Sequence, residues 1–158
     1  MIKKLFCIIS ITVCSLLISC IVFANEEPIS QNQIEMETVF INDEVFYLKT
    51  YISNNSDKNE EESRGTITRT KTSNLENSAG QIMISVSVTG TFTYNGSSAT
   101  CISCSGSSIS YHPAWYISDY YVSRSGNSAT NYTTAVQNNT YTYYKNVTLS
   151  CSADGTVY

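Results

Sequence analysis

The chain has 158 residues and a formal net charge of −4 at neutral pH, and charged residues make up only 14% of it. This length supports one domain with a core of its own, but not two. No basic stripe stands out in the sequence, so the composition argues against nucleic acid as a partner.

The first 24 residues have the pattern of a signal peptide. Lys3 and Lys4 precede an apolar run, and Val22-Phe23-Ala24 offers a cleavage site before a polar segment. We therefore predict that residues 1–24 are removed and that the protein is secreted.

A second processing route competes with this one. The sequence Leu17-Ile18-Ser19-Cys20 also fits a lipoprotein box, in which Cys20 would be lipidated and hold the protein at the cell surface. That route would leave the apolar residues Ile21-Val22-Phe23 where a polar tether is expected. Free secretion is therefore preferred, and no membrane association is expected after cleavage unless Cys20 is lipidated.

Residues 25–63 form an acidic segment, in which ten acidic residues face only Lys49 and Lys58. Between Thr38 and Ile52 the segment turns apolar and aromatic, and Asn42-Asp43-Glu44 is a plausible turn between two short strands. The hairpin either packs on the body or belongs to a removable pro-segment. Residues 54–63 are expected to be a solvated linker.

Residues 64–158 form the body of the protein, and residues 82–94 are its clearest strand. Even positions from Ile82 to Tyr94 are apolar apart from Gly90, whereas most odd positions carry Ser or Thr. This period of two predicts a long strand with one buried face.

A tight turn follows this strand at Asn95-Gly96, a dipeptide suited to a two-residue type I′ turn. Such a turn would place Gly90 opposite Cys101, with Cys101 inward and Cys104 outward.

The remaining strands are expected to alternate with turns about every ten residues. We predict an edge strand at 64–72, a bend at 112–115, strands at 115–123, 128–136 and 141–151, and turns at 125–127 and 137–139. No helical period appears after the signal. The prediction is an all-β, antiparallel β-sandwich of about six or seven strands, immunoglobulin-like in type.

Three cysteines remain after the signal: Cys101, Cys104 and Cys151. A redox role for Cys101-x-x-Cys104 would need a helix start, and zinc would need four ligands, so both readings are disfavoured. A disulfide between Cys101 and Cys151 is one possibility and would contribute on the order of 4 kcal/mol. Buried free thiols are the other.

Residues for acid–base catalysis are sparse. His112 is the only histidine, and Glu76 and Asp119 are the only carboxylates between residues 64 and 148. The sequence therefore predicts that the protein is not an enzyme and has no catalytic residues, cofactor or metal.

Aromatic residues give the best indication of a binding site. A cluster surrounds the 112–115 bend: Tyr111, Trp115, Tyr116, Tyr120 and Tyr121. Such rings on an exposed strand face can stack on sugars or anchor a protein interface. The alternative is that half of them face the core.

Three stretches carry a resemblance: SVSVTGTFTYNGSSATC, SRSGNSAT and KNVTLSCSADGT. They resemble small exported β-rich proteins of Gram-positive bacteria with no assigned activity, over about residues 64–158. The resemblance implies export and a β-fold, and supplies no active residue.

Two functions are consistent with these expectations. The first is an exported, non-enzymatic β-sandwich that binds envelope glycan or an extracellular protein through its Tyr/Trp face. The second is a secreted toxin, bacteriocin-like protein or inhibitor that is matured by removal of residues 25–63.

Overall fold

The computed structural model describes residues 35–54 and 64–158, and its regular elements are antiparallel β-strands. The strands are β1 Glu35–Ile41, β2 Glu44–Asn54, β3 Gly65–Glu76, β4 Ile82–Tyr94, β5 Ala99–Ser110, β6 Trp115–Ser125, β7 Ser128–Gln137 and β8 Tyr141–Ser150. Within these residues there is no apolar helix long enough to cross a membrane. The predicted signal peptide, the lipidation site at Cys20 and most of the linker lie outside the described residues.

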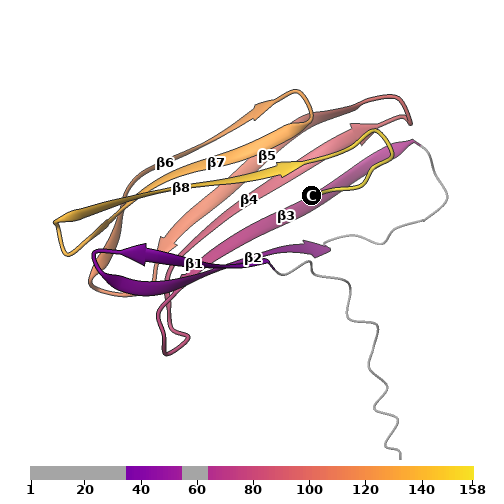
Figure 1. The fold of residues 1–158 in the computed structure, drawn as a ribbon. Coiled ribbons are helices and arrows are strands. Elements are labelled where there is room, and N and C mark those ends of the chain that lie inside the picture. Colours follow the sequence, from indigo (N-terminus) through magenta and orange to yellow (C-terminus); the bar gives the residue numbers. More distant parts are fainter. Residues whose placement is uncertain (1–34, 55–63) are drawn as a thin grey trace, which may run out of the picture.

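The strands form two sheets, with the order β1-β2-β3-β4-β5 in one and β6-β7-β8 in the other. Figure 1 shows the three-stranded sheet (orange to yellow) lying over the five-stranded one. Buried side chains of β4, β7 and β8 belong to one cluster between the sheets. The all-β, two-layer prediction is therefore confirmed.

The connectivity differs from the predicted immunoglobulin-like type. Every strand within a sheet pairs with its neighbour in sequence, whereas immunoglobulin domains pass strands back and forth between sheets. Residues 64–158 hold six strands, β3 to β8, within the predicted six or seven, and the described residues as a whole hold eight. The additional strands are β1 and β2, which continue the sheet of the body.

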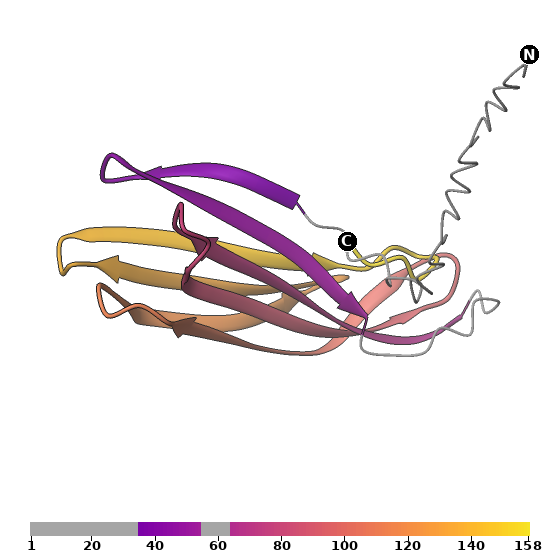
Figure 2. The same cartoon turned by 90° about the horizontal axis from the view of Figure 1, so that it is seen from below.

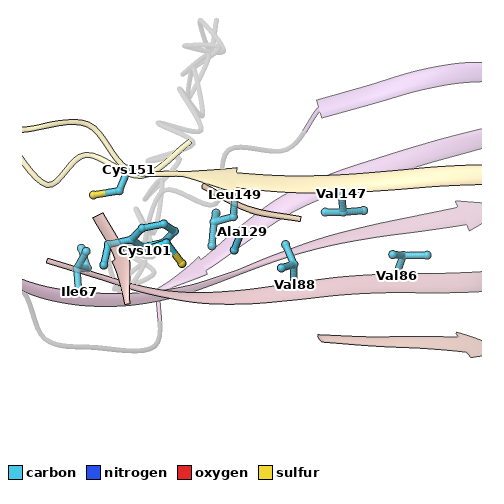
Figure 3. Packing of buried hydrophobic residues seen from close by; sticks show 9 residues of the cluster. Ile67, Val86, Val88, Cys101, Ala129, Val147, Leu149 and Cys151 are labelled. Atoms are coloured by element: carbon cyan, nitrogen blue, oxygen red, sulfur yellow. The ribbon is translucent and has the colours of Figure 1, made fainter. Parts of the chain in front are cut away.

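Strand β4 has the predicted bounds, and its even-numbered side chains face the other sheet. Ile84, Val86, Val88 and Phe92 are each at most 1% exposed. Figure 3 shows Val86 and Val88 of β4 opposite Val147 and Leu149 of β8. The alternation fails only at Met83, which is buried because the β3–β4 register shifts there.

The turn after β4 is not the predicted two-residue type. Tyr94 pairs with Ala99, so the loop has four residues, and only Gly96 among them has a positive φ, of 81°. The side chain of Asn95 accepts hydrogen bonds from the N–H groups of Ser97 and Ser98, at 3.0 and 2.9 Å. Asn95 thus shapes the loop through its side chain instead of adopting a left-handed backbone.

The return strand β5 carries a bulge that changes the predicted orientation of one cysteine. Phe92 pairs with Cys101 and Thr91 pairs with Ser103, which leaves Ile102 as an extra residue. Cys101 is inward as predicted, but Cys104 also packs against the core instead of pointing outward.

The strand predicted at 64–72 is present as β3, but it is not an edge strand, because β3 lies inside the sheet between β2 and β4.

The predicted turn at Asn42-Asp43 is present, and both residues have positive φ, of 51° and 63°. Figure 2 shows the β1–β2 hairpin (indigo) at one border of the molecule. Phe46 and Leu48 of this hairpin belong to the buried core.

A polar layer separates two apolar clusters in the interior. Along β7, Ala129 belongs to one cluster and Ala135 to the other, and Asn131 and Thr133 lie between them. The amide nitrogen of Asn131, fully buried, donates to the carbonyl oxygens of Ser87 and Ser107 at 2.9 and 3.1 Å. A side chain from one sheet is thereby bonded to the backbone of the other.

Gly106 makes room for this contact. A Cβ atom at Gly106 would lie 2.5 Å from the carbonyl oxygen of Ser87 and 3.1 Å from the amide nitrogen of Asn131. The absence of a side chain therefore allows the Asn131 amide to approach the β4 and β5 backbones.

Candidate binding surface

The outer surface of the three-stranded sheet is set by the alternation of β7. Its odd-numbered residues from Ala129 to Gln137 are buried, and its even-numbered residues point away from the other sheet. Pairing carries this orientation to both neighbours, because directly opposed residues share a face. Tyr132 pairs with Tyr121 of β6, and Thr134 pairs with Tyr144 of β8.

Four tyrosines share this outer surface, which we call the tyrosine face: Tyr116, Tyr121, Tyr132 and Tyr144. Tyr144 is 73% exposed, Tyr121 57% and Tyr116 46%. The rings of Tyr121 and Tyr132 are stacked, with centroids 4.7 Å apart and planes 14° from parallel. This pair forms a continuous aromatic surface across two strands.

Polar side chains lie between these rings. Asp119 and Asn146 are both exposed on the same surface, opposite Thr134 and Tyr132. Hydroxyl groups of neighbouring strands bond to one another, as in the 3.0 Å contact between Thr130 and Thr148. The tyrosine face therefore combines flat apolar rings with carboxylate, amide and hydroxyl groups.

Only two of the five predicted ligand-face residues, Tyr116 and Tyr121, lie on the tyrosine face. Trp115 is 3% exposed and belongs to the core, in edge-to-face contact with Phe46 at 5.8 Å between ring centroids. Its assignment to a surface is therefore wrong. Tyr120 is exposed but lies on the opposite face of β6, because it pairs with the buried Thr133.

The fifth predicted residue, Tyr111, is 60% exposed and follows the end of β5. Its backbone N–H donates to the carbonyl of Met83, so it belongs to the connection between the sheets. Tyr111 is therefore exposed but is not part of the outer surface of β6, β7 and β8.

A bulge explains why Tyr116 and Tyr121 share a face. Ile117 pairs with Ala135 and Asp119 pairs with Thr134, so Ser118 is an extra residue in β6. Residues five apart would otherwise point to opposite faces. The bulge depends on hydrogen bonding to β7, including a 3.1 Å bond from the Ser118 hydroxyl to the carbonyl of Thr134.

The three cysteines of the body are free thiols in this structure. Burial raises the pKa of both Cys101 and Cys151, which disfavours the reactive thiolate at neutral pH. Figure 3 shows that their sulfur atoms do not point toward each other. Their thiols donate to the carbonyls of Ser103 and Ser152, and the Cys101–Cys151 disulfide stays a prediction.

Among the described residues, no group of three or more His, Cys, Asp or Glu side chains is placed to bind a metal ion. Comparisons with protein-family models, with curated proteins and with solved structures found no match.

The buried phenol of Tyr143 is expected to make the stability of the protein depend on pH. Burial raises its pKa to about 12, and the carboxylate of Glu37 adds to the shift. The folded protein favours the neutral phenol. Its contribution to the free energy of unfolding is therefore fully present below the ordinary pKa near 10 and is lost as the pH approaches 12. Urea unfolding between pH 10 and 12 should show a smaller loss of stability in Tyr143→Phe than in the wild type. An equal loss in both proteins would contradict this assignment.

Proposed function

We propose that this protein is a non-enzymatic binding module that recognises an envelope glycan through the tyrosine face. The observation that carries the proposal is the placement of four tyrosines on one outward surface, three of them well exposed. Monomeric proteins rarely leave several large aromatic groups together in water unless the surface has a partner.

The chemistry of the surface suits a sugar. A tyrosine ring offers a large, flat contact area for the apolar side of a sugar ring and loses little rotamer freedom when it binds. Asp119 and Asn146 lie beside the rings and can accept and donate hydrogen bonds to sugar hydroxyls. Such a surface supplies both the stacking and the polar contacts that a glycan needs.

The length of the surface favours an oligosaccharide. Tyr116 pairs with Val136 and Tyr121 pairs with Tyr132, so the rings spread over five positions of β7. At about 3.4 Å per residue this covers roughly 14 Å, which exceeds one sugar ring. Export through the predicted signal peptide would expose this surface to glycans of the cell envelope.

The alternative of a toxin or inhibitor released by removal of residues 25–63 is less well supported. Strand β2 pairs with β3 from Tyr47 opposite Glu76 to Asn54 opposite Arg69. Removal of this hairpin would take the buried side chains of Ile41 and Phe46 out of the core, uncover Trp115, which contacts Phe46, and leave β3 at a sheet edge.

A panel of envelope and plant polysaccharides, tested by affinity electrophoresis and by pull-down on insoluble polymers, would test the proposal. At least one glycan should bind, and Tyr121→Ala and Tyr144→Ala should each weaken binding about tenfold or more.

The matched control is Tyr111→Ala, which removes an equally exposed ring from outside the tyrosine face. Its binding should equal that of the wild type. Absence of binding to every glycan, or the same loss in Tyr111→Ala as in Tyr144→Ala, would overturn the proposal.

A further inference from the structure

The free edge of β1 lacks the bulges and backbone contacts found at the other three sheet edges of the described residues. Strands β5 and β6 carry bulges, and the guanidinium of Arg124 donates to the carbonyl oxygens of Cys101 and Ile102 on β5. At the end of β8, the backbone of Ser150 already bonds to that of Tyr158. Strand β1 pairs with β2 without a bulge, and its sequence has no lysine, arginine or proline. These are the usual means by which an edge strand is kept from pairing.

The turn after β1 determines which backbone groups point out of this edge. Ile41 and Glu44 flank the two-residue turn and pair directly, so they exchange hydrogen bonds as the closing pair of the hairpin. Hydrogen-bonded and non-hydrogen-bonded pairs then alternate along the two strands. The N–H and C=O groups of Met36, Thr38 and Phe40 therefore point away from β2, toward the free edge.

The side chains on the outer face of β1 are largely apolar and exposed. Met36 is 68% exposed and Phe40 72%, and Val45, which pairs with Phe40, is 40% exposed. Thr38, between Met36 and Phe40, is also exposed. Figure 2 shows β1 at the border of the molecule, and none of the described strands pairs with its outer edge. A regular edge strand with such side chains is a template for another strand.

We propose that β1 pairs antiparallel with β1 of a second copy of this chain, about a two-fold axis at Thr38. This pairing joins the two five-stranded sheets into one continuous sheet. Met36 of each copy then lies opposite Phe40 of the other, and the two Thr38 residues lie opposite each other. Each of these three pairs exchanges two main-chain hydrogen bonds, about six in all.

The sequence of β1 selects this register over its neighbours. An axis at Glu37 or at Val39 would leave about four of the six hydrogen bonds, because fewer residues with free backbone groups would be opposed. An axis at Glu37 would also place two carboxylates directly opposite each other. With the axis at Thr38, Glu35 lies opposite Ile41 and Glu37 lies opposite Val39. No like charges are then directly opposed.

The inward charges of β1 are compatible with this pairing. The two Glu37 carboxylates would be diagonal neighbours, about 7–8 Å apart. Glu37 is exposed to solvent, and Lys145 lines the same cleft, so the repulsion is screened and partly neutralised. On the outer face, the thioether of Met36 packs on the ring of Phe40, which is a favourable contact.

The dimer does not depend on the glycan proposal. The tyrosine face belongs to the three-stranded sheet, whereas β1 belongs to the five-stranded one, so both tyrosine faces stay free. Because each copy contributes one strand edge to the contact, we expect a dissociation constant in the micromolar range.

Sedimentation velocity of the purified protein measures this association. The full chain is expressed, so that export and processing take place before purification. Between about 1 and 300 µM, the wild type should pass from monomer to dimer and stop there, because pairing occupies β1 of both copies. A monomer at every concentration, or continued growth to larger assemblies, would overturn the inference.

Thr38→Pro removes the N–H group at the centre of the interface, and proline is tolerated at a strand edge that faces solvent. This variant should raise the dissociation constant of the dimer at least about thirtyfold, because two hydrogen bonds are lost. Thr38→Val is the matched control, since it keeps the N–H group, and its dissociation constant should stay within about threefold of the wild type. Melting curves check that both variants fold, and equal dissociation constants for the two would contradict the proposed pairing.

A cysteine cross-link tests the register without the proline variant. The Cα atoms of a hydrogen-bonded pair are about 5.5 Å apart, which is within the range of a disulfide. Thr38→Cys should therefore give a disulfide-linked dimer on mild oxidation, detected on a non-reducing gel. Thr100→Cys, at an exposed threonine of β5, should stay monomeric on the same gel. Absence of the cross-link in Thr38→Cys, or equal cross-linking of the two variants, would rule out an axis at Thr38.

Discussion

Replacing Asn131 by leucine is expected to lower the free energy of unfolding by about 3–4 kcal/mol. The Asn131 amide is fully buried and donates to the carbonyl oxygens of Ser87 and Ser107 and to the hydroxyl of Ser108. Leucine cannot make these bonds, so acceptors inside the sandwich would be left without partners. Urea unfolding monitored by circular dichroism measures the difference.

The matched control is Asn146→Leu, which replaces an exposed asparagine on the outer surface of β8. Its stability should stay within about 0.5 kcal/mol of the wild type. A loss below about 1 kcal/mol in Asn131→Leu would show that the bonds between the sheets contribute little, and would contradict the role of the polar layer.

Replacing Trp115 by alanine is expected to cost about 3–5 kcal/mol of stability. Trp115 is 3% exposed and contacts Phe46 and Tyr143 edge-to-face, at 5.8 and 6.2 Å between ring centroids. Alanine would leave a cavity between the rings of Phe46 on β2 and Tyr143 on β8. Thermal and urea unfolding of Trp115→Ala, compared with Trp115→Phe, would measure the effect, and phenylalanine should recover part of the loss.

Tyr144→Ala provides the contrast, because Tyr144 is 73% exposed and its loss should change stability by no more than about 0.5 kcal/mol. Wild-type stability in Trp115→Ala would contradict its place in the core. The two substitutions thus separate a structural aromatic residue from one that is available to a ligand.

The long strands could be predicted because their hydrophobic pattern is local. Residues 82–94 alternate cleanly, and the strand has the predicted bounds. The turn at Asn42-Asp43 follows from residues that tolerate a positive φ. The same period of two puts Val147, Leu149 and Cys151 on one face of the strand predicted at 141–151, and all three are buried.

The bulges could not be predicted, and they account for most errors in side-chain orientation. Extra residues at Met83, Ile102 and Ser118 shift the alternation within β4, β5 and β6. Each shift depends on pairing with a neighbouring strand, which single-strand periodicity does not contain. The orientation of Cys104 was wrong for this reason.

Only part of the tyrosine face could be predicted from the sequence. A cluster around residues 111–121 was recognised, but proximity in sequence mixed the core residue Trp115 with exposed tyrosines. One local signal was available, since Trp115 and Ile117 alternate with the more polar Tyr116 and Ser118, and this pattern places Trp115 inward. The contributions of Tyr132 and Tyr144 required the register of β6, β7 and β8.

The position of β3 in the sheet was predicted wrongly for a different reason. Arg69 and Lys71 point inward, and inward charges are typical of edge strands, yet β3 is covered by β2. Lys71 lines the open side between β1 and β8, so the charge keeps access to solvent without being at an edge. The sequence predicted a hairpin in the acidic segment but did not show that its second strand would pair with β3.

The most direct test of the proposed glycan-binding surface is an NMR titration of the protein with a polysaccharide that it binds. The ring resonances of Tyr116, Tyr121, Tyr132 and Tyr144 should shift together, and the indole resonance of Trp115 should stay in place. Shifts confined to other surfaces, with the four tyrosine rings unchanged at saturation, would contradict a glycan site on the outer sheet.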